Sequence, residues 1–553
     1  MAGVELGGLT RRDSFVALAL AAVVLVAGFV RLVPGVVGAF HDDAVYAITA
    51  KALAQGGGYH LINLPGAPPQ TKYPILYPAA LALLWRSAST LEARLLAMQV
   101  ATLVAAALAL AAAYLYVVRF RYVERVPALA AGVLCASAPN VLYYASAVLS
   151  EMPFALLVVA SLWTTEAYVR VGPTTPRRAL GAGIVAALPF LCRSAGIVVP
   201  VAALVIAARA RRSLLWMLAG VALVTLPWIL WMVRGVGGLA AEPIVGYQQD
   251  YLGHWSTGYF GYGAQSRLVL AATIFGTNVL KACTAIGEIA FEGMTRSLYA
   301  YSERAWVLTT ALGAAAWLAI AVRARRLELL PFTLLAYLAL ICSWPWPPDR
   351  FLIPILFFLA AAIFALVARA AKRILPSRFR SLAVAVALTA VVPLNVQTLA
   401  EYASVSTRAH FPYFMLPDTP VAWASYRDAF AWLDAHAAAD DVLAADFDSM
   451  TALYTGHPTI RPFVPRPSSL YYGGDAPPLG SPSDLVSALA TYRVRYLFVS
   501  PMPAFPEEDA FYELVGRVQA EHPGLLRPMY RGSDPRFVVF EIGPADTTAD
   551  RPR

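Results

Sequence analysis

Charged side chains are scarce in this chain. Asp, Glu, Lys and Arg make up 14% of its 553 residues, whereas hydrophobic residues make up 59%. Because a soluble domain carries roughly 25% charged residues, this composition excludes an ordinary water-soluble protein. The formal net charge of +9 does not indicate nucleic acid as a partner, because most of the excess lies in short loops between apolar runs.

Cysteine is also rare, and the pattern excludes a disulfide framework, because three of the four cysteines lie in apolar runs and Cys283 stands alone. Residues 399–553 lack a glycine-rich phosphate loop and metal-ligand spacing. His41 stands beside two aspartates, but one histidine without ligand spacing does not predict a metal site. We therefore expect no cofactor, with a divalent metal at His41 as the alternative.

Long apolar runs, in contrast, are abundant. Runs of about 18 to 25 residues recur through residues 14–398, each long enough to cross ~30 Å of hydrocarbon as a helix. The first run, residues 14–33, is long for a signal peptide and is followed by many others, so we expect an uncleaved first span. The sequence predicts a polytopic α-helical membrane protein.

Arginine-rich loops between the runs predict the orientation, since basic loops stay in the cytoplasm. The run over 179–208 contains Arg193 near its middle. We interpret it as a hairpin with Arg193 at the outer turn, because every basic loop then stays inside. This predicts eleven crossings, a cytoplasmic N-terminus and an outer C-terminus. The basic loops lie at residues 11–12, 119–125, 170–178, 209–212, 323–326 and 369–380.

The composition changes beyond Leu399. Residues 399–553 carry the charges, prolines and alternating patterns of a water-soluble domain, and helices alternate there with short strands, which predicts a small α/β domain outside the cytoplasm. Residues 1–398 form the predicted transmembrane module, with outer segments at 34–93 and 234–303. The expected soluble helices are 426–438, 485–492 and 507–521, and the expected strands are 442–445, 496–499, 527–531 and 537–540.

Ionisable residues gather at the predicted outer ends of the spans. They come from five separate stretches of sequence, and ionisable groups that converge at a membrane boundary often mark functional sites. If they form one site, the groups must lie within substrate-scale reach, and separations beyond about 15–20 Å would exclude it. These residues are Asp42, Asp43, Lys72, Glu151, Arg193, Asp349 and Arg350.

The acidic residues among them also have structural interpretations. Asp42 and Asp43 precede a helical stretch and suit an N-cap, although catalysis or ligand binding is favoured for this pair. Glu151 begins a span, where the helix dipole favours an acid, and both interpretations stay open for it.

The basic residues have two interpretations each. Lys72 can anchor at the membrane interface or bind a phosphate. Arg193 and Arg350 can pair with acids for structure or clamp a phosphate. A phosphate clamp is favoured for Arg350, and both interpretations stay open for Lys72 and Arg193.

Four short motifs follow one another along the chain. In that order they resemble the GT-C glycosyltransferases, and within them the family of the dolichyl-phosphate-mannose protein mannosyltransferases and the bacterial lipid A aminoarabinose transferases. A fifth motif, Tyr454-Thr455-Gly456-His457-Pro458, resembles part of the soluble outer domain of bacterial members. The four are Asp42-Asp43-Ala44-Val45-Tyr46, Lys72-Tyr73-Pro74-Ile75-Leu76-Tyr77-Pro78, Ser150-Glu151-Met152-Pro153-Phe154 and Arg350-Phe351-Leu352-Ile353-Pro354-Ile355.

Two motifs depart from the family pattern. The family's Asp-Glu pair is Asp42-Asp43 here, with a shorter second acid, and its Lys-Pro-Pro element is Lys72-Tyr73-Pro74. Both departures bear on how the outer loop places its side chains.

The resemblance implies a lipid-phosphate-sugar-dependent glycosyltransferase. It would move a hexose or pentose from a polyprenyl-phosphate donor to an acceptor hydroxyl at the outer face of the membrane, and invert the anomeric centre. Cleavage leaves a lipid phosphate, which fixed cations stabilise, and the acceptor needs a base. The implied roles are general base for Asp42, orientation of the base or acceptor binding for Asp43, donor phosphate binding for Lys72, Arg350 and Arg193, and substrate binding for Tyr46, Tyr73 and Glu151.

The implied partners are a polyprenyl-phosphate-linked sugar, membrane lipid, and an acceptor protein, glycolipid or polysaccharide. The implied location is a bacterial-type inner or plasma membrane. Aromatic residues of the outer segment, Trp255, Tyr259, Phe260 and Tyr262, are expected to stack on sugars or cover the acceptor. The alternative function is a transporter or flippase of a lipid-linked or anionic solute. Transporters tend to have internal repeats and midplane charges, and neither is evident in this sequence.

Overall fold

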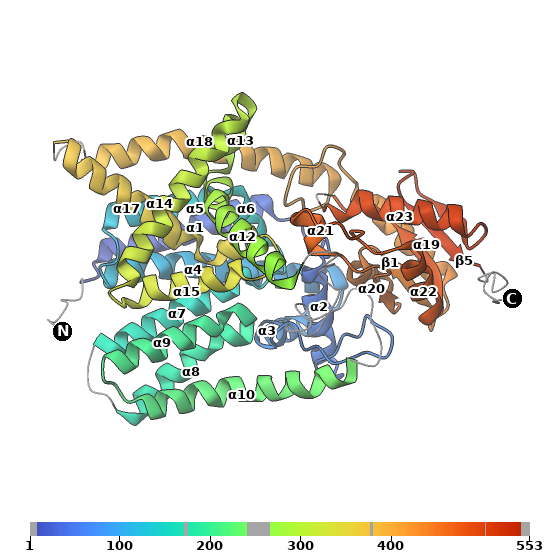
Figure 1. Cartoon of the computed structure of the whole chain (residues 1–553), viewed down its shortest axis with the longest axis horizontal. Coiled ribbons are helices and arrows are strands. Elements are labelled where there is room, and N and C mark those ends of the chain that lie inside the picture. Colours follow the sequence, from blue (N-terminus) through green and yellow to red (C-terminus); the bar gives the residue numbers. More distant parts are fainter. Residues whose placement is uncertain (1–7, 171–174, 240–265, 377–379, 504, 544–553) are drawn as a thin grey trace.

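The computed structural model describes residues 8–170, 175–239, 266–376, 380–503 and 505–543. Its N-terminal part is a bundle of helices (Figure 1). The helices are α1 (Arg11–Arg31), α2 (Asp42–Ala54), α3 (Leu76–Trp85), α4 (Leu91–Arg119), α5 (Arg125–Ser137), α6 (Pro139–Ser146), α7 (Glu151–Arg170), α8 (Pro176–Cys192), α9 (Val198–Arg209), α10 (Leu214–Leu239), α12 (Arg267–Ala290), α13 (Glu292–Tyr301), α14 (Trp306–Ala324), α15 (Leu329–Cys342), α16 (Asp349–Leu352), α17 (Leu356–Ile374) and α18 (Arg380–Ala409).

The chain is an integral membrane protein. Within the described ranges, eight helices are long and apolar enough to cross a membrane, or nine if the bent pair α5 and α6 forms one span. The eleven predicted crossings leave out α12 and instead count the α5–α6 pair and the shorter helices α8, α9 and α15, which have 17, 12 and 14 residues. The candidate spans are α1, α4, α7, α10, α12, α14, the run of α16 and α17, and α18.

One predicted segment differs in the structure, and part of it lies outside the described residues. The expected outer segment 234–303 contains α12, which is itself a candidate span, because Asn278, Lys281 and Glu288 interrupt its apolar pattern without breaking the helix. The aromatic residues predicted to contact sugars, at positions 255–262, lie outside the described residues.

The predicted hairpin over 179–208 is confirmed. Helix α8 ends at Cys192, Arg193 adopts an extended conformation, and a short 3-10 turn over Ser194–Ile197 leads into α9. The two helices pack against each other, and Gly196 lies against the backbone of Pro189 with no room for a Cβ atom. Arg193 therefore stands at the tip of the hairpin.

The C-terminal part is a five-stranded mixed sheet covered by helices (Figure 1). The strand order is β2-β1-β3-β5-β4, in which β1 is parallel to β2 and β3, and β5 is antiparallel to β3 and β4. The elements are α19 (Trp423–His436), β1 (Val442–Ala445), α20 (Asp448–Thr455), β2 (Thr459–Ile460), α21 (Pro467–Tyr471), α22 (Pro482–Thr491), β3 (Val494–Val499), α23 (Glu507–Glu521), β4 (Leu526–Arg531) and β5 (Val538–Ile542).

The segments before and after α2 join the two parts. Figure 1 shows α2 and α3 between the bundle and the C-terminal sheet, and α2 packs against α20. Apolar residues of these segments, including Val36 and Leu61, belong to the same buried cluster as Phe447 and Met450 of the C-terminal part. The Tyr454 hydroxyl also accepts a hydrogen bond from the Val37 backbone N–H at 3.0 Å. The two parts therefore share one core.

Candidate active site

A cavity of about 1390 Å³ lies where the bundle meets the C-terminal part. Its wall is built from the start of α2, the loop over 72–74, the tip of the α8–α9 hairpin, α12, the loop over 343–350 and several C-terminal residues. The predicted site residues that line it are Asp42, Tyr46, Lys72, Tyr73, Arg193 and Arg350.

A tight turn places the acidic pair. Helix α2 begins at Asp42, and the N-cap position is occupied by His41, not by an aspartate. The N-cap interpretation of the acidic pair is therefore wrong, and both aspartates instead lie in the first turn, where the helix dipole favours negative charge.

Asp43 points away from the cavity. Its carboxylate accepts hydrogen bonds from the backbone N–H groups of Gly38 at 2.7 Å, Ala44 at 3.0 Å and Phe40 at 3.3 Å. Burial raises the pKa of Asp43 to about 6, although the backbone N–H groups act in the opposite direction. The side chain holds the loop that presents its neighbour Asp42.

Asp42 faces the cavity between two donors. The Tyr73 hydroxyl donates to Oδ1 at 2.6 Å, and Arg350 Nη1 donates to Oδ2 at 2.6 Å. Burial disfavours the charged carboxylate, but Arg350, His41 and Lys72 more than offset this, so the pKa of Asp42 lies well below its usual range. Asp42 is therefore an ionised carboxylate.

Glu151 lies behind this wall at the start of α7 and is fully buried. Arg350 Nε donates to its carboxylate, and Arg193 Nη1 lies 2.7 Å from the same oxygen. Arg350 thus joins Asp42 to Glu151, and Arg193 closes the network from the hairpin. Buried charges need such compensation, because an unpaired charge in a low-dielectric interior is costly.

Lys72 and Tyr73 reach the cavity from a loop that Gln70 fixes. The Gln70 side-chain oxygen accepts hydrogen bonds from the backbone N–H groups of Lys72 and Tyr73, at 2.8 and 3.2 Å. Burial lowers the pKa of Lys72 while Asp42 acts in the opposite direction. Lys72 also interacts electrostatically with Arg350, so the three groups lie within reach of one ligand.

Tyr46 completes the wall one turn along α2 from Asp42. Its hydroxyl shares a hydrogen bond with Ser150 Oγ at 2.8 Å, and its ring lies 5.2 Å from that of Tyr73. All eight predicted site residues are therefore gathered in one region. Six line the cavity, whereas Asp43 and Glu151 support it from behind.

Sequence reasoning missed the contribution of the C-terminal part. Arg461, Phe463 and Glu507 line the same cavity, and Arg461 Nε lies 3.5 Å from Asp448 Oδ1. Arg461 directly follows β2, a strand of two residues, which carries no recognisable periodicity. The only signal in the sequence is the basic charge of Arg461 directly after Ile460.

The far side of the cavity is lined by ionisable and aromatic residues of α12 and the loop before α16. Lys281, Glu288 and Asp349 interact electrostatically with one another, and the Trp346 ring lies 5.6 Å from that of Tyr471. Among the residues that the structure describes, no group of three or more His, Cys, Asp or Glu side chains is arranged to hold a metal ion.

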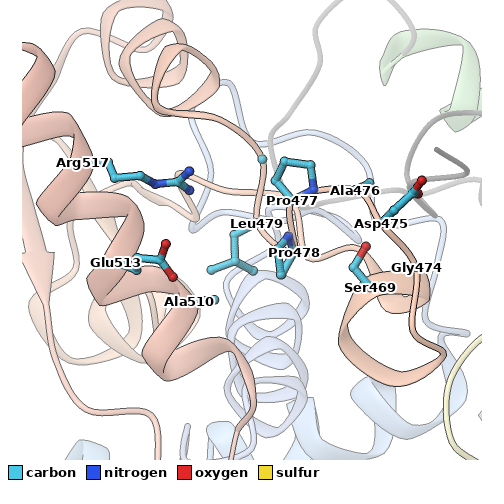
Figure 2. Close-up of a pocket in the computed structure, with 11 residues that line it drawn as sticks. Ser469, Gly474, Asp475, Ala476, Pro477, Pro478, Leu479, Ala510, Glu513 and Arg517 are labelled. Atoms are coloured by element: carbon cyan, nitrogen blue, oxygen red, sulfur yellow. The ribbon is translucent and has the colours of Figure 1, made fainter. Parts of the chain in front are cut away.

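A smaller cavity of about 400 Å³ lies within the C-terminal part. Figure 2 shows Glu513 and Arg517 of α23 facing the loop that contains Pro477 and Leu479. None of the predicted site residues lines this cavity.

No protein-family model and no curated protein matches the chain. Solved structures do match it. The Archaeoglobus fulgidus oligosaccharyltransferase tethered to an acceptor peptide has a TM-score of 0.56 and 15% identity, over 97% of this chain and 74% of that one. ArnT from Cupriavidus metallidurans in the apo state has a TM-score of 0.51 and 15% identity, over 95% and 96% of the two chains. Both are GT-C proteins. This chain has the GT-C fold.

A further structure extends the likeness of the GT-C chain to a lipid-bound form. AglB from Archaeoglobus fulgidus in complex with an inhibitory peptide and a dolichol-phosphate has a TM-score of 0.51 and 15% identity, over 88% of this chain and 70% of that one. At such identities the likeness establishes the fold. The resemblance read from the motifs is confirmed at the level of the GT-C fold.

Proposed function

We propose that this GT-C chain is a glycosyltransferase that moves a sugar from a polyprenyl-phosphate donor to an acceptor hydroxyl at the outer face of the membrane. The observation that carries the proposal is the position of Asp42. It is an ionised carboxylate on the wall of a large cavity, between Tyr73 and Arg350 and close to Lys72. A base beside fixed cations is what glycosyl transfer from a phosphate requires.

The cations suit the phosphate of the donor. Lys72, Arg193 and Arg350 line the cavity, and ion pairs with Asp42 and Glu151 hold the two guanidinium groups in place. A sugar phosphodiester is negatively charged, so these fixed cations attract it. The same cations then stabilise the lipid phosphate as the sugar departs.

Donor binding also activates the base. Arg350 is bound to Asp42 Oδ2, which lowers the pKa of Asp42 and makes it a weak base. A donor phosphate competes for Arg350, so the carboxylate regains basicity when the donor is in place. Asp42 then takes the acceptor proton while the acceptor oxygen attacks the anomeric carbon from the side opposite the phosphate, which inverts that centre.

The prenyl chain fits a groove between α12 and α15. Leu280 and Leu340 line the cavity and are 51% and 36% exposed, so the cavity wall continues onto the apolar surface of the bundle. A lipid chain is favoured on such a surface by about 0.8 kcal/mol for each buried CH₂ group. The dolichol-phosphate bound to AglB supports a ligand of this class.

The acceptor approaches from the side of the C-terminal part, which we place outside the cytoplasm with residues 399–553 as a soluble domain. Arg461, Phe463 and Glu507 form that side of the cavity. A protein, a glycolipid or a polysaccharide hydroxyl is compatible with this polar and aromatic wall, and AglB was solved with a peptide. Tyr46, Tyr73 and Glu151 position the substrates, and Asp43 orients the loop that carries the base. The chain is proposed to lie in a bacterial-type plasma membrane with a cytoplasmic N-terminus.

The test is a panel of polyprenyl-phosphate sugars offered to purified protein, with release of lipid phosphate as the readout. An acceptor-rich membrane extract is supplied. We expect release from one donor, and loss of release in Asp42→Asn but not in Asp428→Asn, which changes an exposed aspartate of α19. No release from any donor, or equal release by wild type and Asp42→Asn, would contradict the proposal.

A further inference from the structure

His41 has an unusual backbone conformation at the edge of the cavity. Its φ is 67° and its ψ is −61°, and the Asp42 N–H donates to the Phe40 carbonyl at 2.9 Å across it. This is a γ-turn of the rare positive-φ form, which is strained for any residue with a Cβ atom. Strain of this kind persists only where surrounding contacts hold it, and it is concentrated at functional sites.

Those contacts come from the C-terminal part of the chain. The imidazole Nε2 lies 2.9 Å from Oδ1 of Asp448, a fully buried carboxylate at the start of α20. The Ser449 hydroxyl donates to the His41 carbonyl at 3.1 Å. Arg461 lies 3.5 Å from the same Asp448 oxygen. Both the backbone and the ring of His41 are therefore held by residues roughly 400 positions away.

The other ring nitrogen faces the reacting centre. Nδ1 of His41 lies 3.7 Å from Oδ1 of Asp42, a separation that a small side-chain rotation closes to hydrogen-bond distance. The His41 ring thus lies between two carboxylates, with Nε2 held at Asp448 and Nδ1 facing Asp42, so that Nδ1 can exchange a proton with Asp42 while the contact with Asp448 holds Nε2.

This arrangement matters because the other partners of Asp42 are poor proton acceptors. Arg350 is a permanent cation, and the Tyr73 hydroxyl already donates to Asp42. His41 has a ring nitrogen that can accept a proton. The charged groups that face it are Asp42, Asp448 and Glu507, with Arg461 beside them.

We propose that His41 takes over the proton that Asp42 removes from the acceptor, and that Asp448 positions the ring and stabilises the resulting imidazolium. The inference rests on the proposed function. The acceptor O–H bond breaks and its proton passes to Asp42 Oδ1, while the new glycosidic bond forms and the bond between the anomeric carbon and the donor phosphate breaks, which releases the lipid phosphate. The proton then passes to Nδ1 of His41 and leaves to water, while Asp448 stays ionised throughout. The active site is thus complete only when the C-terminal part is docked on α2.

Three variants test the relay with the donor found in the panel described above. His41→Gly accommodates the positive φ without strain and leaves a hole for free imidazole. Asp448→Asn removes the buried charge at nearly constant volume. Tyr454→Phe is the control, because it removes two hydrogen bonds between the two parts and leaves His41 untouched. The Tyr454 hydroxyl accepts from the Val37 N–H and donates to the Gly35 carbonyl.

We expect kcat to fall about tenfold or more in His41→Gly and Asp448→Asn, with the donor KM within about twofold of wild type. Added imidazole should restore turnover of His41→Gly and not of Asp448→Asn, and Tyr454→Phe should behave as wild type. A purely structural role for His41 predicts no rescue by imidazole.

Failure of the relay and failure of the proposed function give different results. Wild-type turnover with unchanged kcat in both relay variants overturns the relay and leaves the glycosyltransferase proposal standing. A loss of kcat in His41→Gly that imidazole does not restore also overturns it. Absence of wild-type turnover with every donor overturns both proposals.

Discussion

Arg350 is the residue whose removal should disturb the site most, because it compensates two carboxylates at once. Its guanidinium is 17% exposed and donates to Asp42 and to Glu151, which is 0% exposed. Replacing Arg350 by glutamine leaves Glu151 with Arg193 alone and Asp42 without its strongest partner. Breaking a buried ion pair by removing one member costs about 3–5 kcal/mol.

The exposed ion pair between Arg296 and Glu401 supplies a matched control. Its atoms are 3.3 Å apart and its side chains are 45% and 44% exposed, so its removal should cost about 0–1 kcal/mol. The two arginine substitutions remove the same charge. They differ mainly in burial and in the number of carboxylates left behind.

Thermal unfolding in detergent, followed with a thiol-reactive fluorophore, measures the difference. Cys135, Cys192 and Cys342 are buried and react only when the bundle opens. The entropy of unfolding is about 2.1 cal/mol/K per residue. For cooperative unfolding of the whole chain, the free-energy cost of Arg350→Gln therefore corresponds to a fall in Tm of about 3–4 °C. Arg296→Gln should lower Tm by less than about 1 °C. Equal shifts in the two variants would refute the reasoning that burial of the network determines its energetic weight.

Three further substitutions have defined outcomes. Lys72→Ala should weaken binding of a polyprenyl phosphate by about 10- to 100-fold, the value of one charge-assisted hydrogen bond, measured by titration of the lipid into the protein. Asp446 is buried and its pKa is raised by burial to about 7, above its usual value in an unfolded chain, so its contribution to stability is present below about pH 4 and is lost as the pH rises through 7. Tm should therefore fall between pH 5 and pH 8, and Asp446→Asn should flatten that slope. Gly38→Ala should lower Tm, because Gly38 has φ +118° and an added Cβ would lie 2.5 Å from Met450 Cγ, whereas Gly56→Ala, also at positive φ but with nothing within 4 Å, should cost less.

For each of these three predictions, one result would contradict the reasoning. Unchanged lipid affinity in Lys72→Ala would exclude Lys72 as a phosphate ligand. An unchanged slope of Tm against pH in Asp446→Asn would show that groups other than Asp446 cause the slope. Equal losses in the Gly38 and Gly56 variants would show that backbone conformation alone, and not the approach of α20, requires glycine at position 38.

Much of the C-terminal fold follows from local patterns. Strand β1 and helix α23 have the predicted limits, because a short apolar run and a long amphipathic stretch carry strong periodic signals. Strand β2 was not predicted, since two residues have no periodicity and pair only because β1 lies beside them. The parallel pairing of β1 with β2 and β3 is likewise a tertiary property.

In the candidate site, too, some residues could be predicted from the sequence and others depend on tertiary packing. Basic loops and apolar runs predicted that Asp42 and Arg350 lie at one face, and the structure joins them by a hydrogen bond at 2.6 Å. Tyr73 stands where the family pattern has proline, and in this structure its hydroxyl donates a hydrogen bond to Asp42. Asp448 and Arg461 could not be predicted, since their position depends on how a separate part of the chain docks onto α2.

The most direct test of the central claim is a single-turnover measurement with donor already bound, which compares Asp42→Asn with wild type and separates chemistry from binding. The account predicts that sugar transfer slows by about 10²–10⁴-fold, the usual contribution of a general base, while the affinity for the polyprenyl-phosphate donor is retained. Transfer at the wild-type rate by donor-saturated Asp42→Asn would contradict it, because no carboxylate would then be needed at that position on the cavity wall.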